Sequence, residues 1–392
     1  MSRRGPSGGR LGWLVAAGLL TASTAVALVL AEVLARYAVD PADFLHVTPI
    51  EDPIVGLRIP ALASGHDSLG FRNRDVPARA DIVAIGDSMT YGVGAPRDAS
   101  WPQQLGVLLG ERVYNLALGG FGPLQYLHMA RTTAKDLKPR LMIVGFYFGN
   151  DMMDAYYLAH GRQHWHEWRI SKGPAPAVTA FDRAGLAEPE KRFKSLRDWL
   201  SRNSVVYSML RATVFQPLAA KEQDAMAQQA TRDVRMPWVD PSDPAARTIF
   251  TPQFRLAAVD LNEPAVREGM QIAQKAFAAL KIEADRQGTR LLTVLIPTKE
   301  RAYCRYLLKS GAKMPDSFVR LCEAESKASA EFVRFLEEHG VAHVDVTAVL
   351  ESHADRHVQI YPTDSDGHPQ ATGYRVIADE IASAVRRLFP AK

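Results

Sequence analysis

An apolar run that ends in a serine-bearing turn is the part of this sequence best suited to chemistry. Residues 82–85 read Ile-Val-Ala-Ile, and Gly86-Asp87-Ser88-Met89-Thr90 follows. Such a run is typical of a buried parallel strand, and open parallel sheets bind ligands beyond the carboxyl ends of their strands. Because Gly86 and Gly92 allow a sharp turn, the pattern predicts that Ser88 is presented there as a nucleophile. The lipase-type elbow G-x-S-x-G is absent, since Thr90 stands in place of the second glycine.

A serine hydroxyl is a weak nucleophile, and it needs a base, a group that orients the base and donors for the developing oxyanion. His368 lies beside carboxylates in the segment 364–369, which reads Asp-Ser-Asp-Gly-His-Pro. Gly120 follows a second apolar strand, and its backbone N–H can point into a site. Asn150 follows a third and can donate through its side-chain amide. We therefore expect three strand ends and His368 to converge on one crevice.

These blocks resemble the motifs of the SGNH (GDSL-type) hydrolase superfamily, and the resemblance spans residues 68–388. It implies that Ser88 is the nucleophile and His368 the general base. It also implies that the backbone N–H groups of Ser88 and Gly120, with the side-chain amide of Asn150, form the oxyanion hole. No cofactor is implied.

The triad acid is the point where the sequence departs from the commonest pattern of the family. That pattern is D-x-x-H, but the residue three positions before His368 is Ser365. Asp366 gives D-x-H, a spacing that resembles membrane-anchored and polysaccharide-acylating branches of the superfamily. We therefore expect Asp366 to orient His368, with Asp364 as the alternative.

The elements that must position these residues alternate between strand and helix patterns. We expect an α/β fold, a three-layer doubly wound sheet of about five parallel strands, preceded by one N-terminal transmembrane helix. The resemblance implies the flavodoxin-like strand order 2-1-3-4-5. The expected strands are Asp81–Ile85, Arg112–Leu116, Leu141–Tyr147, Arg290–Ile296 and Val341–Val346. The expected helices are Trp101–Leu109, Pro123–Leu137, Pro264–Gln287, Asp316–His339 and Ala371–Leu388.

The N-terminal region predicts a membrane anchor. Leu11–Ala31 contains no charged residue in 21 positions, which is long enough to cross a hydrocarbon core. Arginines lie within residues 1–10 and acidic residues follow the apolar run, so the N-terminus is expected in the cytoplasm and the catalytic domain outside it, in the periplasm or its equivalent. A cleaved signal peptide is the alternative, and the length of the apolar run favours the signal anchor. A net charge of +4 without a basic run gives no indication of nucleic-acid binding.

The remaining chain divides into a connector and one catalytic domain. Residues 38–79 are polar and proline-rich and predict a spacer, and 80–390 form the hydrolase domain. Within that domain, 152–262 is too long for an ordinary connection and is expected to be an insertion that forms a lid or an acceptor wall. Its aromatic rings could pack on a sugar or an acyl chain. His164 and His166 lie in this insertion without a known metal spacing, so we expect no metal.

Two cysteines, Cys304 and Cys322, are separated by 18 positions. In an oxidising compartment they could form a disulfide, and two buried thiols are the alternative.

Together these features predict a serine esterase that acts on acyl esters, preferably O-acetyl esters of a cell-surface or exported polysaccharide. The alternatives are an envelope O-acyltransferase, a non-catalytic carbohydrate-binding subunit and a cytoplasmic enzyme. The expected partners are an acylated small molecule or carbohydrate and, through the N-terminal helix, the membrane.

Overall fold

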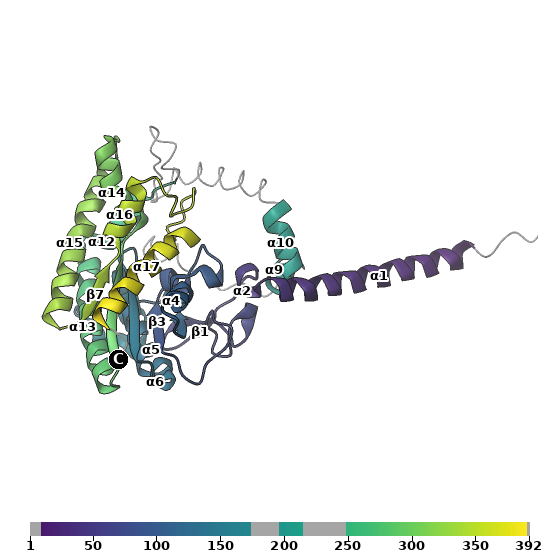
Figure 1. Ribbon diagram of the computed structural model, residues 1–392, viewed down its shortest axis with the longest axis horizontal. Helices are drawn as coiled ribbons and strands as arrows, with labels where there is room; N and C mark the ends of the chain where they lie inside the picture. Colours follow the sequence, from purple (N-terminus) through teal and green to yellow (C-terminus); the bar gives the residue numbers. More distant parts are fainter. Residues whose placement is uncertain (1–8, 174–195, 215–247, 390–392) are drawn as a thin grey trace, which may run out of the picture.

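A five-stranded parallel sheet forms the centre of the computed structural model, which describes residues 9–173, 196–214 and 248–389 (Figure 1). The strand order β4-β3-β5-β6-β7 is the flavodoxin-like order that the family resemblance implied. The strands of this sheet are β3 Ile82–Gly86, β4 Val113–Ala117, β5 Leu141–Tyr147, β6 Arg290–Ile296 and β7 Ala342–Asp345. All neighbouring pairs are parallel, so the carboxyl ends of the strands meet at one edge.

Alternate residues of the strands contribute side chains to two hydrophobic cores, one on each face of the sheet. Val83, Ile85 and Val144 belong to one core, together with α5 Pro123–Arg131, α7 Asp151–Gly161, α13 Pro264–Arg286 and α15 Asp316–Glu338. Ile82 and Ile143 belong to the other core, with α4 Trp101–Leu109, α14 Lys299–Ser310, α16 Thr347–Asp355 and α17 Ala371–Leu388. Burial on both faces explains why the strands read as continuous apolar runs.

Shorter elements complete the described chain. They are α2 Pro41–Phe44, β1 Ile50–Asp52, β2 Gly56–Arg58, α3 Ser88–Tyr91, α6 Thr133–Leu137, η3 Gln163–Trp168, α9 Leu196–Asn203, α10 Val205–Val214 and α12 Pro252–Val259, with the short 3-10 turns η1 Ala63–Gly65 and η2 Arg97–Ala99. The single helix expected over Pro123–Leu137 is two helices, because Thr132 leaves the helical backbone angles, with φ −115° and ψ −99°.

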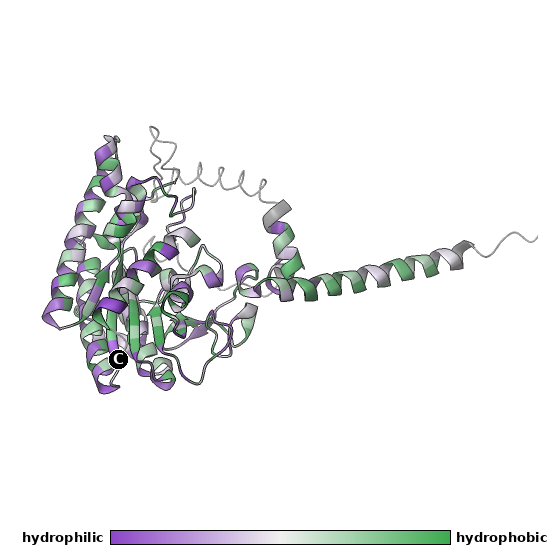
Figure 2. Cartoon of the chain, in the orientation of Figure 1, coloured by the Kyte–Doolittle hydropathy of each residue, from purple (hydrophilic) through white to green (hydrophobic). Residues whose placement is uncertain are grey.

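The N-terminal helix α1, Gly9–Ala38, projects from the domain and is the candidate transmembrane helix (Figure 1). Residues 12–38 are long and apolar enough to cross a membrane, and none of that apolar segment is buried against the protein. Its surface is hydrophobic along most of its length (Figure 2).

Residues 38–79 are not the independent spacer that their composition suggested. Arg72 is buried and pairs with Asp43 of α2 at 2.9 Å, and Arg97 forms an ion pair with Asp40. Asn73 and Asn115 exchange two hydrogen bonds of 2.9 Å. The charged and amide side chains of this segment therefore attach it to the domain.

The start of the 152–262 insertion is part of the core. Its residues 152–161 continue α7, which packs against α13. Trp165 and Trp168 are 3% and 7% exposed, and Trp165 donates to the carbonyl of Ile54 at 2.8 Å. These two rings are therefore not available to stack on a sugar or an acyl chain. Residues 174–195 and 215–247 of the insertion lie outside the described residues, and the lid or acceptor wall stays a prediction.

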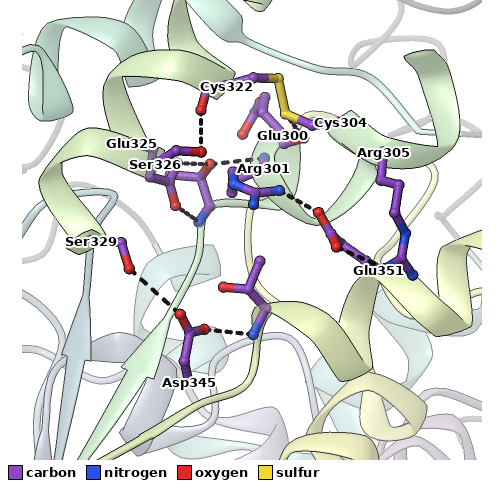
Figure 3. Close-up of polar contacts among 12 residues, drawn as sticks. Glu300, Arg301, Cys304, Arg305, Cys322, Glu325, Ser326, Ser329, Asp345 and Glu351 are labelled. Atoms are coloured by element: carbon purple, nitrogen blue, oxygen red, sulfur yellow. Dashed lines mark hydrogen bonds and ion pairs between the residues drawn. A yellow bond between two sulfur atoms is a disulfide. The ribbon is translucent and has the colours of Figure 1, made fainter. Parts of the chain in front are cut away.

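A disulfide joins Cys304 of α14 to Cys322 of α15, with their Cα atoms 6.1 Å apart (Figure 3). The same two helices are also linked through the backbone at the start of α14, where Thr298 donates from its N–H to Glu325 at 2.8 Å. The structure therefore has the bridge, rather than the two buried thiols.

Candidate active site

Ser88 lies where β3 ends, at the first residue of α3. Asp87 is the N-cap of this helix and accepts a hydrogen bond from the N–H of Met89 at 2.9 Å. A Cβ atom on Gly86 would lie 2.0 Å from Oγ1 of Thr90, so no other residue fits there without a shift. Gly92, with φ +88°, ends the helix. These two glycines and the cap explain how one turn presents the serine.

His368 and Ser88 are brought together although 280 positions separate them. Nε2 of His368 lies 2.8 Å from Oγ of Ser88. Nδ1 of His368 lies 2.6 Å from Oδ1 of Asp366, which also accepts the backbone N–H of His368 at 3.1 Å. Asp364 instead accepts the N–H of Asp366 at 2.9 Å. Of the two expected acids, it is therefore Asp366 that contacts the imidazole.

The electrostatics around Ser88, His368 and Asp366 favour an ionised Asp366. Partial burial acts to raise the pKa of this carboxyl, but the hydrogen bonds and charge of His368 outweigh it and lower the pKa. Burial has the opposite outcome at Asp87, whose fully buried carboxyl has its pKa raised to about 6. Oγ of Ser88 also lies 3.3 Å from Oδ2 of Asp87.

The three expected oxyanion donors lie around the same strand ends. The N–H of Ser88 is at the amino end of α3, where backbone donors have no partner within the helix. Gly120 is exposed, with φ +81°, and a side chain there would meet open space. Nδ2 of Asn150 donates to Asp154 at 2.5 Å, and the second hydrogen of that amide is left for another acceptor.

Lys299 supports the loop that carries Asp366 and His368, a role that sequence reasoning missed. Its Nζ donates to the carbonyls of Asp366 at 2.9 Å, Asp364 at 3.0 Å and Ile249 at 2.7 Å. Burial lowers the pKa of this ammonium to about 8. The position of Lys299, three residues after the end of β6, was the only local signal.

Arg255 of α12 was also missed. Its guanidinium lies 3.4 Å from the carbonyl of Gly149, beside Asn150, and 5.7 Å from the ring centre of Tyr147. A side chain on Gly367 would collide with it, at 2.5 Å. Arg255 therefore packs between the third strand end and the histidine loop.

Two histidines of the insertion, His160 and His164, have partners other than the residues around Ser88. His160 is buried and contacts Glu268 at 2.9 Å, and His164 packs edge-on against Trp165. Among the described residues, no group of three or more histidine, cysteine or acidic side chains could hold a metal ion. A metal-independent site stays a prediction.

Comparison with known proteins adds a family match at the C-terminal side. Residues 254–392 match the family model described as "SGNH hydrolase-like domain, acetyltransferase AlgX". This range includes Asp366 and His368 but not Ser88, Gly120 or Asn150. No curated protein is significantly similar to the chain.

Three solved structures illustrate the level of structural similarity. A protein assigned to the G-D-S-L lipolytic family from Desulfitobacterium hafniense is 12% identical, with 77% of this chain and 98% of that chain covered and a TM-score of 0.37. TesA is 12% identical, with 79% of this chain and 99% of TesA covered and a TM-score of 0.36. The acetyl xylan esterase AlAXEase is 10% identical, with 78% of this chain and 99% of that chain covered and a TM-score of 0.37. Similarities of this size carry no inference about function.

The chain has the sheet order that the family resemblance implied, its motif residues gather at the carboxyl edge of that sheet, and its C-terminal part matches an SGNH family model. The chain is therefore similar to SGNH hydrolases in its sheet order and in the sequence of its C-terminal part.

Proposed function

We propose that this protein is a serine esterase for acyl esters, in which Ser88 is the nucleophile, His368 the general base and Asp366 the acid that orients it. The observation that carries this proposal is the continuous row from Oγ of Ser88 to Nε2 of His368 at 2.8 Å and from Nδ1 to Asp366 at 2.6 Å. Distances of this size lie within reach of direct proton transfer.

Acylation would begin when Oγ of Ser88 attacks the ester carbonyl carbon and its proton passes to Nε2 of His368. Asp366 would hold Nδ1 protonated and stabilise the imidazolium. When the tetrahedral intermediate collapses, the bond to the leaving oxygen breaks and His368 returns the proton to that oxygen. The products of this half-reaction are the free alcohol and an ester of Ser88.

Deacylation would reverse these roles. Water loses a proton to His368 and attacks the acyl carbon. The bond from that carbon to Oγ of Ser88 then breaks, the proton returns to Oγ, and the carboxylic acid is released. The N–H groups of Ser88 and Gly120 and the amide of Asn150 would stabilise the oxyanion in both half-reactions, each donor contributing about a hundredfold or more in kcat.

Acetyl esters of an envelope or exported polysaccharide are the substrate class we favour. The family that matches residues 254–392 is described by an acetyltransferase, which supports an acetyl group. The apolar α1, with arginines before it, supports anchoring to the cytoplasmic membrane with the domain outside. The disulfide between Cys304 and Cys322 fits an oxidising compartment.

Acetyl transfer is the second candidate, and the description of the matching family is the observation that favours it. The chemistry differs only in deacylation, where a sugar hydroxyl would replace water. A non-catalytic binding subunit is less well supported, because it has no need for the contact between Ser88 and His368.

The test is turnover of p-nitrophenyl esters of increasing acyl length by the full-length protein in detergent. Ser88→Ala should abolish turnover, while Ser329→Ala, which changes a serine on α15, should not. A fluorophosphonate should label the wild type, and peptide mass spectrometry should locate the adduct on Ser88. A folded protein that neither turns over an ester nor reacts with the fluorophosphonate would overturn the proposal.

Hydrolysis and transfer are separated by their products. The acetyl donor is incubated with and without an acceptor oligosaccharide, and free acetate and acetylated sugar are both measured. Acetate release that is independent of the acceptor supports the esterase. Acetylated sugar that forms at the expense of acetate, and only with Ser88 present, supports the transferase.

A further inference from the structure

Two charged side chains in the last turns of α1 hold a helical corner made by α9 and α10. The carboxylate of Glu32 accepts the N–H groups of Val205 and Val206 at 2.9 and 3.1 Å. These are the first two residues of α10, where a carboxylate is favourable because of the helix dipole. Arg36 donates to the last carbonyl of α9, that of Asn203, at 2.6 Å. The corner is therefore attached to α1 by polar contacts that lie about one helical turn apart, at Glu32 and Arg36.

The depth of Glu32 and Arg36 in a membrane is set by the length of the apolar segment that precedes them. The 21 residues of Leu11–Ala31 rise about 31 Å along a helix, which matches a hydrocarbon core of about 30 Å. If α1 spans the membrane, Glu32 and Arg36 lie at the boundary between acyl chains and headgroups. Because they hold α9 and α10, these two helices lie at the same depth.

The corner also exposes the side chains that this boundary favours. Leu196 and Trp199 of α9 are 73% and 46% exposed, and their i, i+3 spacing places them on the same side of the helix. Tyr37, next to Arg36, is 93% exposed. Tryptophan and tyrosine are enriched at membrane–water interfaces. In Figure 1, α10 runs transverse to α1, which is the direction of the membrane plane.

The corner is connected to the nucleophile by a chain of polar contacts. The carbonyl of Ser201 in α9 accepts the N–H of His46, just after α2. In α2, Asp43 pairs with Arg72, and Arg72 donates to the carbonyl of Gly92 at 2.8 Å. Gly92 ends α3, the helix that begins with Ser88. The corner and the helix that carries Ser88 are therefore joined by a continuous series of contacts.

We propose that α9 and α10 form an interfacial foot that lies in the headgroup layer of a phospholipid bilayer and holds the Ser88 crevice at a fixed height and orientation above it. Its partner is the lipid surface itself. This inference rests on the proposed membrane anchoring by α1.

The experiment uses the full-length protein in phospholipid vesicles, with an environment-sensitive fluorophore on one introduced cysteine. The native cysteines are in a disulfide, so the introduced thiol is labelled selectively. Leu196→Cys reports on the foot, Leu20→Cys on α1 and Leu308→Cys on α14, an exposed site on the domain. Lipids carrying a nitroxide near the headgroup or near the bilayer centre serve as quenchers.

The expected result is loss of emission at position 196 with the headgroup-level quencher, at position 20 with the deep quencher and at position 308 with neither. Glu32→Ala should release the foot and remove the quenching at 196 while that at 20 remains. Glu51→Ala, which removes an exposed carboxylate of β1, is the control and should leave the quenching at both positions unchanged.

The two proposals fail in different ways. Quenching at 20 without quenching at 196 would overturn the foot and leave the anchor intact. Absence of quenching at 20 would overturn the anchor, and the foot with it. Quenching at 196 that is equal in the Glu32→Ala protein would overturn the role of Glu32 in holding the foot.

Discussion

The ammonium group of Lys299 donates a hydrogen bond of 2.9 Å to the carbonyl oxygen of Asp366, the residue whose carboxylate contacts His368. Lys299 is 1% exposed, and Thr248 and Ile249 supply further oxygen partners at 3.0 and 2.7 Å. One buried cation therefore ties the histidine loop to the segment that precedes α12. Lys299 does not touch the row of reacting atoms, and it acts as a positioning residue.

Replacing Lys299 by methionine should lower kcat by about a hundredfold with little change in KM, because a small misplacement of His368 weakens proton transfer more than substrate binding. The measurement is p-nitrophenyl acetate turnover, with kcat calculated per site that a fluorophosphonate titrates. Lys309→Met, on the exposed side of the same helix, is the control. A Lys299→Met protein with normal kcat per titrated site would contradict the positioning role.

The two aspartates of the loop should differ sharply. Asp366→Asn keeps the shape but presents the wrong tautomer of His368, so kcat should fall on the order of a thousandfold or more. Asp364→Asn keeps an oxygen acceptor for the N–H of Asp366 and should leave kcat nearly unchanged. The same ester assay measures both variants, and a larger loss in Asp364→Asn would reverse the assignment.

The local patterns of the sequence predicted the sheet well, because each strand is buried on both faces and therefore reads as an apolar run. β5 and β6 have the bounds expected from the sequence, as do α4 and α17. At β3 both bounds are shifted by one residue, to Ile82–Gly86, since Gly86 still pairs with Ala117. The strand order came from the family resemblance, because periodicity does not contain it.

Features that depend on contacts between distant segments could not be predicted. Lys299 and Thr248 are 51 positions apart, and nothing local to either residue indicates their contact. Trp165 has polar neighbours in the sequence, yet the carbonyl of Ile54, 111 positions away, accepts its N–H and the ring is buried. The α14 helix did carry a local signal, with Thr298 as its cap and Gly311 at its end, and it was overlooked.

Removing the disulfide should lower stability without removing activity. Cys304 and Cys322 close a segment of 18 positions, and a loop of this length corresponds to about 3 kcal/mol in the chain-entropy description. Neither cysteine is hydrogen-bonded to the triad residues, so the ester turnover of a Cys304→Ala/Cys322→Ala protein should match the wild type at low temperature. Thermal melting measures the loss, and reductant should lower the Tm of the wild type but not of the double variant.

Asp87 should make the protein less stable as pH rises from about 4 to 6. Its carboxyl is fully buried, and burial raises its pKa from 3.8 to about 6. The folded protein therefore keeps this proton at pH values where the unfolded chain has lost it. The folded state therefore binds more protons than the unfolded state between about pH 4 and pH 6. The contribution of Asp87 to the free energy of unfolding declines as pH rises through this window, and it stays reduced above pH 6.

Asp87→Asn removes this titration and keeps an oxygen acceptor for the N–H of Met89 at the cap of α3. The variant should therefore melt at a higher temperature than the wild type at pH 8, by the equivalent of up to about 3 kcal/mol, and gain nothing at pH 4. Asp98→Asn, which changes an exposed carboxylate, is the control and should show neither effect. The measurement is Tm across this pH range, and an Asp87→Asn curve parallel to that of the wild type would show that Asp87 is ionised at no cost. Such a result would mean that the charge of His368 compensates the buried carboxylate more fully than its burial penalises it, and the two residues would then act as one coupled pair.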